Sequence, residues 1–400
     1  MSRSFHRVVL GLSVALIAVA LLGGFGPAGV SANQSTGAYR QMGVYEEVLH
    51  KIQTDYVTKP DLETVTDGAL HGLLQSLDPD SGYFTPAQWT SYQEHQKDGK
   101  AGPGMIVSKR YGYGSVVSVL PGSPAQEAHI QDGDLINSVE GQSTRDMSVS
   151  MIRALLHGQP GTEVKFQLVR PAKPQPVDMK LTRAEVAPPA LDVQQYENSS
   201  ILYLKPYVLT SDRVDQIIAR LQQMPKNGNK KVLLDLRDVA EGSPEQGMRL
   251  ANAFLKSGVI AKLQGQTVPT KVFSADASKF VTAAPLVVLV NQGTAGAAEI
   301  VAGAVLDNKR GDVVGNRTFG AGAEDKIFNL PSGAAIELTI AKYETPSGSK
   351  IEDDAITPNV PISEAPNDDL LPNAAKQPRT DDQLNKGLDI LKGKSTPQRG

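Results

Sequence analysis

The stretch from residue 285 to residue 300 constrains the fold of this chain most strongly. Leu286 to Val290 contains only leucine and valine, which is typical of a strand in a parallel sheet covered on both faces. Gly293 then turns the chain, and Thr294 is expected to cap a helix that runs to about Lys309. Such a unit places turn residues at the carboxyl end of the sheet, where α/β proteins usually bind ligands. A nucleophile could stand there, yet the turn carries only small side chains: Thr294, Ala295, Gly296, Ala297 and Ala298.

The first 32 residues have the composition of a secretory signal peptide. Arg3 and Arg7 precede an apolar run from Val8 to Leu22, and a small-residue cleavage site ends at Ala32. The run is shorter than the ~20 residues that a membrane-spanning helix needs. We therefore expect export to the periplasm or another extracytoplasmic space. The alternative is an uncleaved anchor, and this segment is the only membrane contact that the sequence predicts.

Charge and cysteine content exclude several classes of function. The chain of 400 residues has 43 acidic and 40 basic side chains mixed along its length, so we expect no nucleic-acid partner. The lack of cysteine excludes disulfides, thiol nucleophiles and thiolate metal sites. No histidine lies beyond His157, so the strand-turn-helix unit has no local imidazole. We expect neither a cofactor nor a metal.

Four regions are expected after the signal segment, which together predict an α+β multidomain protein. Residues 33–99 show helical spacing of apolar side chains, and residues 100–183 change to short alternating strands. Residues 184–365 alternate strands with helices, which predicts a mostly parallel sheet. Residues 366–400 form a polar tail, expected to be loosely attached, with one short helix. The expected sheet strands are Ile201 to Leu204, Val232 to Leu236, Val259 to Leu263 and Leu286 to Val290.

The second of these regions carries three motifs in a fixed order. They are Gly122-Ser123-Pro124-Ala125, Ile130-Gln131-Asp132-Gly133-Asp134-Leu135-Ile136 and Gly158-Gln159-Pro160-Gly161, with a helix expected from Ser148 to Leu156. Residues 100–183 therefore resemble a PDZ domain, a small β-barrel with a helix. The resemblance implies that Gly102-Pro103-Gly104-Met105 forms the carboxylate-binding loop.

The backbone of such a loop explains which partners are expected. Its N–H groups bind a chain-terminal carboxylate, and the peptide adds as a strand beside the helix. Pro103 removes one donor, which leaves the amides of Gly104 and Met105. We expect protein or peptide C-termini as partners; the alternative is that the apolar side chains only pack the small barrel. The expected socket for the last side chain comprises Met105, Val107, Val149, Ile152 and Leu156.

Motifs outside the PDZ region point to one family. Leu77-Asp78-Pro79 ends the helical region, Leu234-Asp235-Leu236-Arg237 closes a predicted strand, and Tyr343 precedes Thr345-Pro346-Ser347-Gly348. With the PDZ domain, these motifs resemble the carboxyl-terminal processing peptidases, or tail-specific proteases, over roughly residues 43–393. The resemblance implies an exported serine endopeptidase with a crotonase-like α/β core and a Ser-Lys dyad supported by Gln. It also implies that the PDZ domain engages substrate C-termini.

This chain departs from the family pattern where the chemistry is expected. The family reads Gly-Ser-Ala-Ser-Ala-Ser-Glu-Ile where this chain has residues 293–300, so Gly296 stands at the nucleophile position. The family's Phe-Gly-Lys-Gly-Ser-Val-Gln aligns so that Ala321 replaces the lysine base and Asp325 the supporting Gln. The interval, 321 − 296 = 25 residues, contains no gap. The oxyanion loop Asn-Pro-Gly-Gly is replaced by a sequence with Glu241, whose charge is expected to oppose a developing oxyanion.

Three hypotheses follow. The leading one is an inactive exported homologue that binds protein C-termini as an adaptor or regulator of envelope proteolysis, with an active paralogue as a further partner. The second is a working serine endopeptidase with a relocated site. For it, Thr294 and Lys326 are the nearest candidates, but Thr294 favours a capping role, and the position of Lys326 aims it at the opposite sheet face. The third is a structural component of an envelope assembly.

Overall fold

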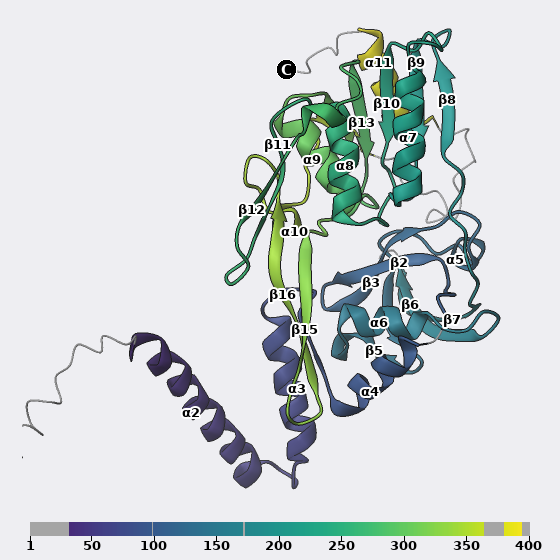
Figure 1. Cartoon of the computed structure of the whole chain (residues 1–400). Helices are drawn as coiled ribbons and strands as arrows, with labels where there is room; N and C mark the ends of the chain where they lie inside the picture. Colours follow the sequence, from purple (N-terminus) through teal and green to yellow (C-terminus); the bar gives the residue numbers. More distant parts are fainter. Residues whose placement is uncertain (1–31, 98, 171–172, 364–379, 394–400) are drawn as a thin grey trace, which may run out of the picture. The chain divides into compact units, whose positions relative to one another are not determined.

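A computed structural model describes residues 32–97, 99–170, 173–363 and 380–393 (Figure 1). It divides into two units, residues 1–66 and residues 67–400. The first contains α2 (Ala32–Asp55), which exposes apolar side chains such as Met42 and Val48, and the start of α3 (Leu62–Gln75). None of the described helices has the length and apolarity needed to cross a bilayer. The predicted signal segment, up to residue 31, lies outside the described residues.

The PDZ region forms an antiparallel sheet with one main helix, as predicted. Its strands follow the order β2-β3-β4-β6-β7, and β5 pairs with β4. Helix α6 (Val149–Leu156) begins where the Ser148 hydroxyl accepts the Met151 N–H at 3.1 Å. The strands are β2 (Met105–Arg110), β3 (Tyr113–Val119), β4 (Leu135–Val139), β5 (Gln142–Ser143), β6 (Glu163–Arg170) and β7 (Lys173–Thr182), and α5 (Pro124–Glu127) follows β3.

The α/β core is built on a six-stranded sheet of order β17-β14-β13-β10-β9-β8. All neighbours in it are parallel except β8 and β9, so the predicted mostly parallel sheet is confirmed. Its strands are β8 (Asp192–Tyr196), β9 (Ile201–Lys205), β10 (Lys231–Asp235), β13 (Leu286–Val290), β14 (Asp312–Gly315) and β17 (Val360–Pro361). Its helices are α7 (Ser211–Gln223), α8 (Pro244–Phe254), α9 (Ala297–Asp307) and α11 (Asp382–Lys392).

Strand β13 is buried on both faces, as its sequence predicts. Leu286, Val288 and Val290 join the core cluster that contains residues of α8 and α9. Val287 and Leu289 belong to a second cluster, which contains Leu388 and Leu391 of α11. Alternate residues of this strand therefore pack into two different cores, which explains why the strand contains no polar residue.

A second sheet of the core corrects one strand prediction. The segment predicted as Val259 to Leu263 forms β11 (Val259–Gln264), which pairs antiparallel with β12 (Lys271–Ser274) and β16 (Ala335–Glu344) and is not a strand of the parallel sheet. The local alternation of strands and helices predicted that β11 joins the parallel sheet of its sequence neighbours. Its actual partner, β16, lies about 80 residues later in the chain, so no local pattern indicates the pairing. The same sheet contains β1 (Gly82–Phe84) and β15 (Ala323–Asn329); α4 (Pro86–His95) and α10 (Ile351–Asp354) lie in the same unit.

Helix α11 corrects the expectation of a loosely attached tail. Leu388 and Leu391 are buried against β13 and its neighbours, and Gly387 lies against Leu233 and Leu289. Arg237 anchors the start of the helix, because its guanidinium bonds Asp381 at 2.9 Å as well as the buried Asp235. The polar composition of the tail concealed this short apolar face. The remainder of the predicted tail, residues 366–379 and 394–400, lies outside the described residues.

We predict that Leu388→Ala lowers the free energy of unfolding by about 2 to 4 kcal/mol, because it opens a cavity beneath the sheet. Urea unfolding followed by circular dichroism measures the loss. Asn385→Ala on the exposed side of the same helix is the matched control and should change stability by less than about 0.5 kcal/mol. Equal effects of the two substitutions would show that α11 does not contribute to the core.

Candidate functional site

The turn after β13 has the geometry of a nucleophile elbow. Gly296 lies at the start of α9 with φ 60° and ψ −116°, a backbone conformation that favours glycine. The prediction that Thr294 caps the helix is wrong, since α9 begins at Ala297. The fully buried Thr294 hydroxyl instead accepts the Asn291 N–H at 2.9 Å and donates to the Leu236 carbonyl at 2.8 Å. These two hydrogen bonds fix the conformation of the turn from its buried side.

Asn291 fastens this elbow to the neighbouring loop after β10. Its Oδ1 accepts the N–H of Gly293 at 3.1 Å and that of Asp238 at 3.0 Å. The Ala295 N–H donates to the Val239 carbonyl at 3.0 Å. The elbow and the loop after β10 therefore form one hydrogen-bonded unit at the carboxyl ends of β10 and β13.

Glu299 joins the elbow to the segment that carries position 321. Its carboxylate is fully buried and accepts the N–H groups of Gly296 at 2.9 Å, Gly320 at 2.7 Å and Ala321 at 2.8 Å. It also accepts the Thr318 hydroxyl. Burial raises the pKa of Glu299, and these donors oppose the rise. This role of Glu299 was not predicted, although an acidic residue at the third helix position after a turn is a recognisable capping signal in the sequence.

Positions 296 and 321, whose backbone N–H groups both donate to Glu299, carry no reactive side chain. A Cβ at Gly296 would have the Ala321 carbonyl oxygen, 3.9 Å away, as its nearest neighbour outside the adjoining residues, so a side chain fits the space. Gly296 and Ala321 themselves offer no hydroxyl or amine. The structure thus brings together the two residues that the sequence predicted as partners.

Carboxyl groups surround the third predicted position, Asp325 on β15. Asp325 accepts the Thr339 hydroxyl at 2.8 Å, and burial followed by the charge of Asp80 raises the pKa of Asp325 to about 6. Asp80 and Glu352 share a hydrogen bond, and burial raises the pKa of both carboxyl groups. Glu352 also accepts the Gly322 N–H at 2.7 Å. An acidic environment therefore adjoins the position where the family pattern has lysine.

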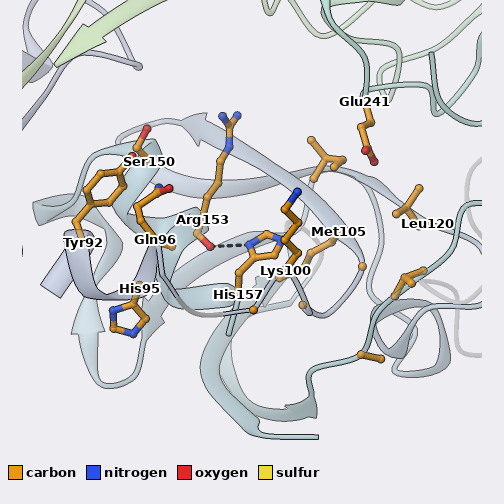
Figure 2. Close-up of a pocket in the computed structure, with 17 residues that line it drawn as sticks. Tyr92, His95, Gln96, Lys100, Met105, Leu120, Ser150, Arg153, His157 and Glu241 are labelled. Carbon is orange, nitrogen blue, oxygen red and sulfur yellow. Dashed lines mark hydrogen bonds between the residues drawn. The ribbon is translucent and has the colours of Figure 1, made fainter. Parts of the chain in front are cut away.

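A groove of about 500 Å³ opens between the predicted carboxylate-binding loop, Gly102 to Met105, and helix α6 (Figure 2). Of the predicted peptide-binding residues, Gly102, Gly104 and Met105 line it. Pro103 is buried, and its carbonyl accepts the Ala125 N–H at 2.9 Å. The structure places the other predicted socket residues inside the domain, with exposed fractions of 3% or less: Val107, Val149, Ile152 and Leu156. Their part in peptide binding stays a prediction.

Several charged or titratable side chains of the groove were not predicted from the sequence as groove residues, among them Lys100, Arg153, His157 and Glu241. The His157 Nδ1–H donates to the Arg153 carbonyl at 2.8 Å, and the ring packs so closely on Gly102 that a Cβ there would come within 2.9 Å of it. Glu241, predicted to lie in the loop that corresponds to the family's oxyanion loop, lines this groove with its side chain (Figure 2). A histidine directly after the predicted helix was the available signal for His157.

Comparisons with known proteins agree with this architecture. The model of peptidase family S41 matches residues 192–362, and that of the PDZ domain matches residues 115–170. The chain is 32% identical over 337 residues to the carboxy-terminal processing protease CtpA of Bacillus subtilis, covering 84% of this chain and 70% of that protein. It is 32% identical to the carboxyl-terminal-processing protease of Picosynechococcus sp., covering 78% and 76%. The chain belongs to the C-terminal processing peptidase family.

A solved structure supports the same assignment. The photosystem II D1 C-terminal processing protease superposes with a TM-score of 0.64 at 26% identity, covering 79% of this chain and 86% of that one. The resemblance described in the sequence analysis aligns Gly296, Ala321 and Asp325 with the Ser, Lys and Gln of the family pattern, and this alignment stays a prediction. The structure shows the elbow and the groove together, with glycine and alanine at positions 296 and 321.

We predict that Asp325→Gln, which restores the family's side chain, alters the pH dependence of stability. Between about pH 4 and pH 6 the unfolded chain releases this proton while the folded chain keeps it, so the free energy of unfolding falls as the pH rises. The substitution should flatten this fall and stabilise the protein above pH 6. Thermal unfolding from pH 4 to pH 8 measures it, with the exposed neighbour Glu324→Gln as control. An unchanged slope would contradict the assigned shift.

Proposed function

We propose that this protein is a proteolytically inactive member of the C-terminal processing peptidase family that binds the C-termini of other proteins. The observation that supports inactivity is the pairing of Gly296 with Ala321 across the Glu299 carboxylate. Serine-type cleavage requires a hydroxyl and a base that accepts its proton. Loss of the nucleophile alone lowers the rate of a serine protease roughly a million-fold.

Three other candidate sites do not supply the missing chemistry. The Thr294 hydroxyl is buried and donates to a backbone carbonyl, so it faces no base. Lys326 lies over the Phe328 ring, with its Nζ 5.2 Å from the ring centre. Ser91 Oγ lies 3.4 Å from the His95 Nδ1, but that nitrogen is 2.8 Å from the Ser91 carbonyl and must carry a proton to bond it. It therefore cannot accept the serine proton.

The charges of the groove suit a terminal carboxylate. Lys100 and His157 line the same cavity as the amide-bearing loop of Gly102 to Met105, and the His157 ring packs on Gly102. Because Pro103 contributes no N–H, a cationic side chain at this point compensates for the missing donor. Bonds from a charged donor to a carboxylate are about twice as strong as neutral ones.

The site of action is inferred from the N-terminal segment. Two arginines, an apolar run and small residues up to Ala32 are the features of an export signal. We infer that the mature protein acts outside the cytoplasm, where it regulates or presents substrates of envelope proteolysis. An active paralogue is one partner of this kind.

We predict that the mature protein binds a short labelled peptide ending in Ala-Ala-Val as the free acid at least about ten-fold more tightly than the same peptide as the amide. The reason is the charge-assisted bonding of the carboxylate, worth about 1.5 to 3 kcal/mol. Lys100→Met should weaken free-acid binding several-fold and leave amide binding unchanged. Fluorescence anisotropy measures both affinities.

Lys165→Met provides the matched control, because Lys165 is exposed on β6 of the same domain and does not line the groove. Equal affinity for acid and amide would refute carboxylate capture. Incubation of the wild-type protein with an unfolded protein forms the second arm, and the substrate should remain intact. Cleavage that purifies with the wild-type protein would favour the relocated active site.

A further inference from the structure

Glu241 adds a carboxylate to the groove beside the loop of Gly102 to Met105, and the described PDZ residues that line this groove include no acidic side chain. The residue belongs to the core, in the loop between β10 and α8, and its side chain points into the cavity lined by Gly104 and Met105 (Figure 2). This loop replaces the Asn-Pro-Gly-Gly sequence of the family. The change that removes an oxyanion-loop residue therefore also adds a carboxylate to the peptide groove.

The backbone at Glu241 is held by hydrogen bonds on both sides, which defines the point from which its side chain projects. The Glu241 carbonyl accepts the Leu209 N–H at 2.8 Å, and Gly242 forms a parallel bridge with Leu209. The approach is so close that a Cβ at Gly242 would come within 2.7 Å of the Leu209 Cβ. On the preceding side, the Val239 carbonyl accepts the Ala295 N–H at 3.0 Å. A charged side chain on such an anchored loop can discriminate between ligands.

The charge of Glu241 is not neutralised by an ion pair within the described part of the chain. The other strongly charged side chains of the groove, Lys100 and Arg153, are basic. Arg153 is partly engaged, since its Nε and one terminal nitrogen donate to the Val107 carbonyl. Among the described residues, the groove thus combines basic side chains, suited to a carboxylate, with a single acidic side chain, that of Glu241.

We propose that Glu241 selects C-termini that carry a lysine or arginine close to the terminal carboxylate. The inference rests on the proposed function and specifies its ligand. A tail of this kind presents a negative terminus to Lys100 and His157 and a positive side chain to Glu241. A glutamate or aspartate at the same place would meet a like charge, which selects against acidic tails.

The test uses three free-acid peptides that differ at one residue and end in Lys-Ala-Val, Gln-Ala-Val or Glu-Ala-Val, titrated into the full mature protein. The Lys peptide should bind about two- to five-fold more tightly than the Gln peptide, the range of an exposed ion pair, and the Glu peptide more weakly. Glu241→Gln should abolish this order, and Glu241→Lys should invert it. Glu127→Gln, an exposed carboxylate of the same unit outside the groove, should leave the order unchanged.

The outcomes separate this inference from the proposed function. If free-acid peptides bind but the order of affinities is flat, or survives Glu241→Gln, the role of Glu241 is refuted while carboxylate capture stands. If no free-acid peptide binds better than its amide, the proposed function fails and the inference fails with it. Circular dichroism of each variant establishes that a lost preference does not reflect unfolding.

Discussion

The buried carboxylate of Glu299 is the interaction on which the site depends. A charged group in this position would cost several kcal/mol without partners, and four donors from the elbow and the segment 318–321 offset that cost. Three of those donors lie about 20 positions after Glu299 in the sequence: the Thr318 hydroxyl and the backbone N–H groups of Gly320 and Ala321. The carboxylate therefore determines where position 321 lies relative to position 296. The spacing of Gly296 and Ala321 is therefore maintained by the Glu299 carboxylate.

On the proposed function, this arrangement explains how the framework of a peptidase is kept without a hydroxyl at position 296 or an amine at position 321. Glu299 contacts the backbone at positions 296, 320 and 321, and these contacts do not require a serine or a lysine there. Gly296 also relieves a positive φ that a serine would strain. On the proposed function, the groove and the loop at Glu241 bind the peptide, while the elbow contributes rigidity.

Much of this could be predicted from the sequence where the signals are local. The run Leu286 to Val290 predicted a strand buried on both faces, and the turn after it predicted the site. The partner of β11 could not be predicted, because its pairing with β16 joins segments distant in the chain. The attachment of α11 was missed since its buried face consists of few residues, among them Leu388 and Leu391, in a polar tail. The location of Glu241 at the groove depends on how the PDZ domain packs against the core, which no local pattern encodes.

The most direct test of the account is restoration of the chemistry in this framework. The variant that combines Gly296→Ser, Ala321→Lys and Asp325→Gln should react with a fluorophosphonate probe at position 296 alone, whereas the wild-type protein should not react. Mass spectrometry of the labelled peptide locates the modified residue. Labelling of a serine or threonine in the wild-type protein would contradict the claim that the chemistry has been lost. A folded triple variant that remains unreactive would contradict the claim that the framework has been kept.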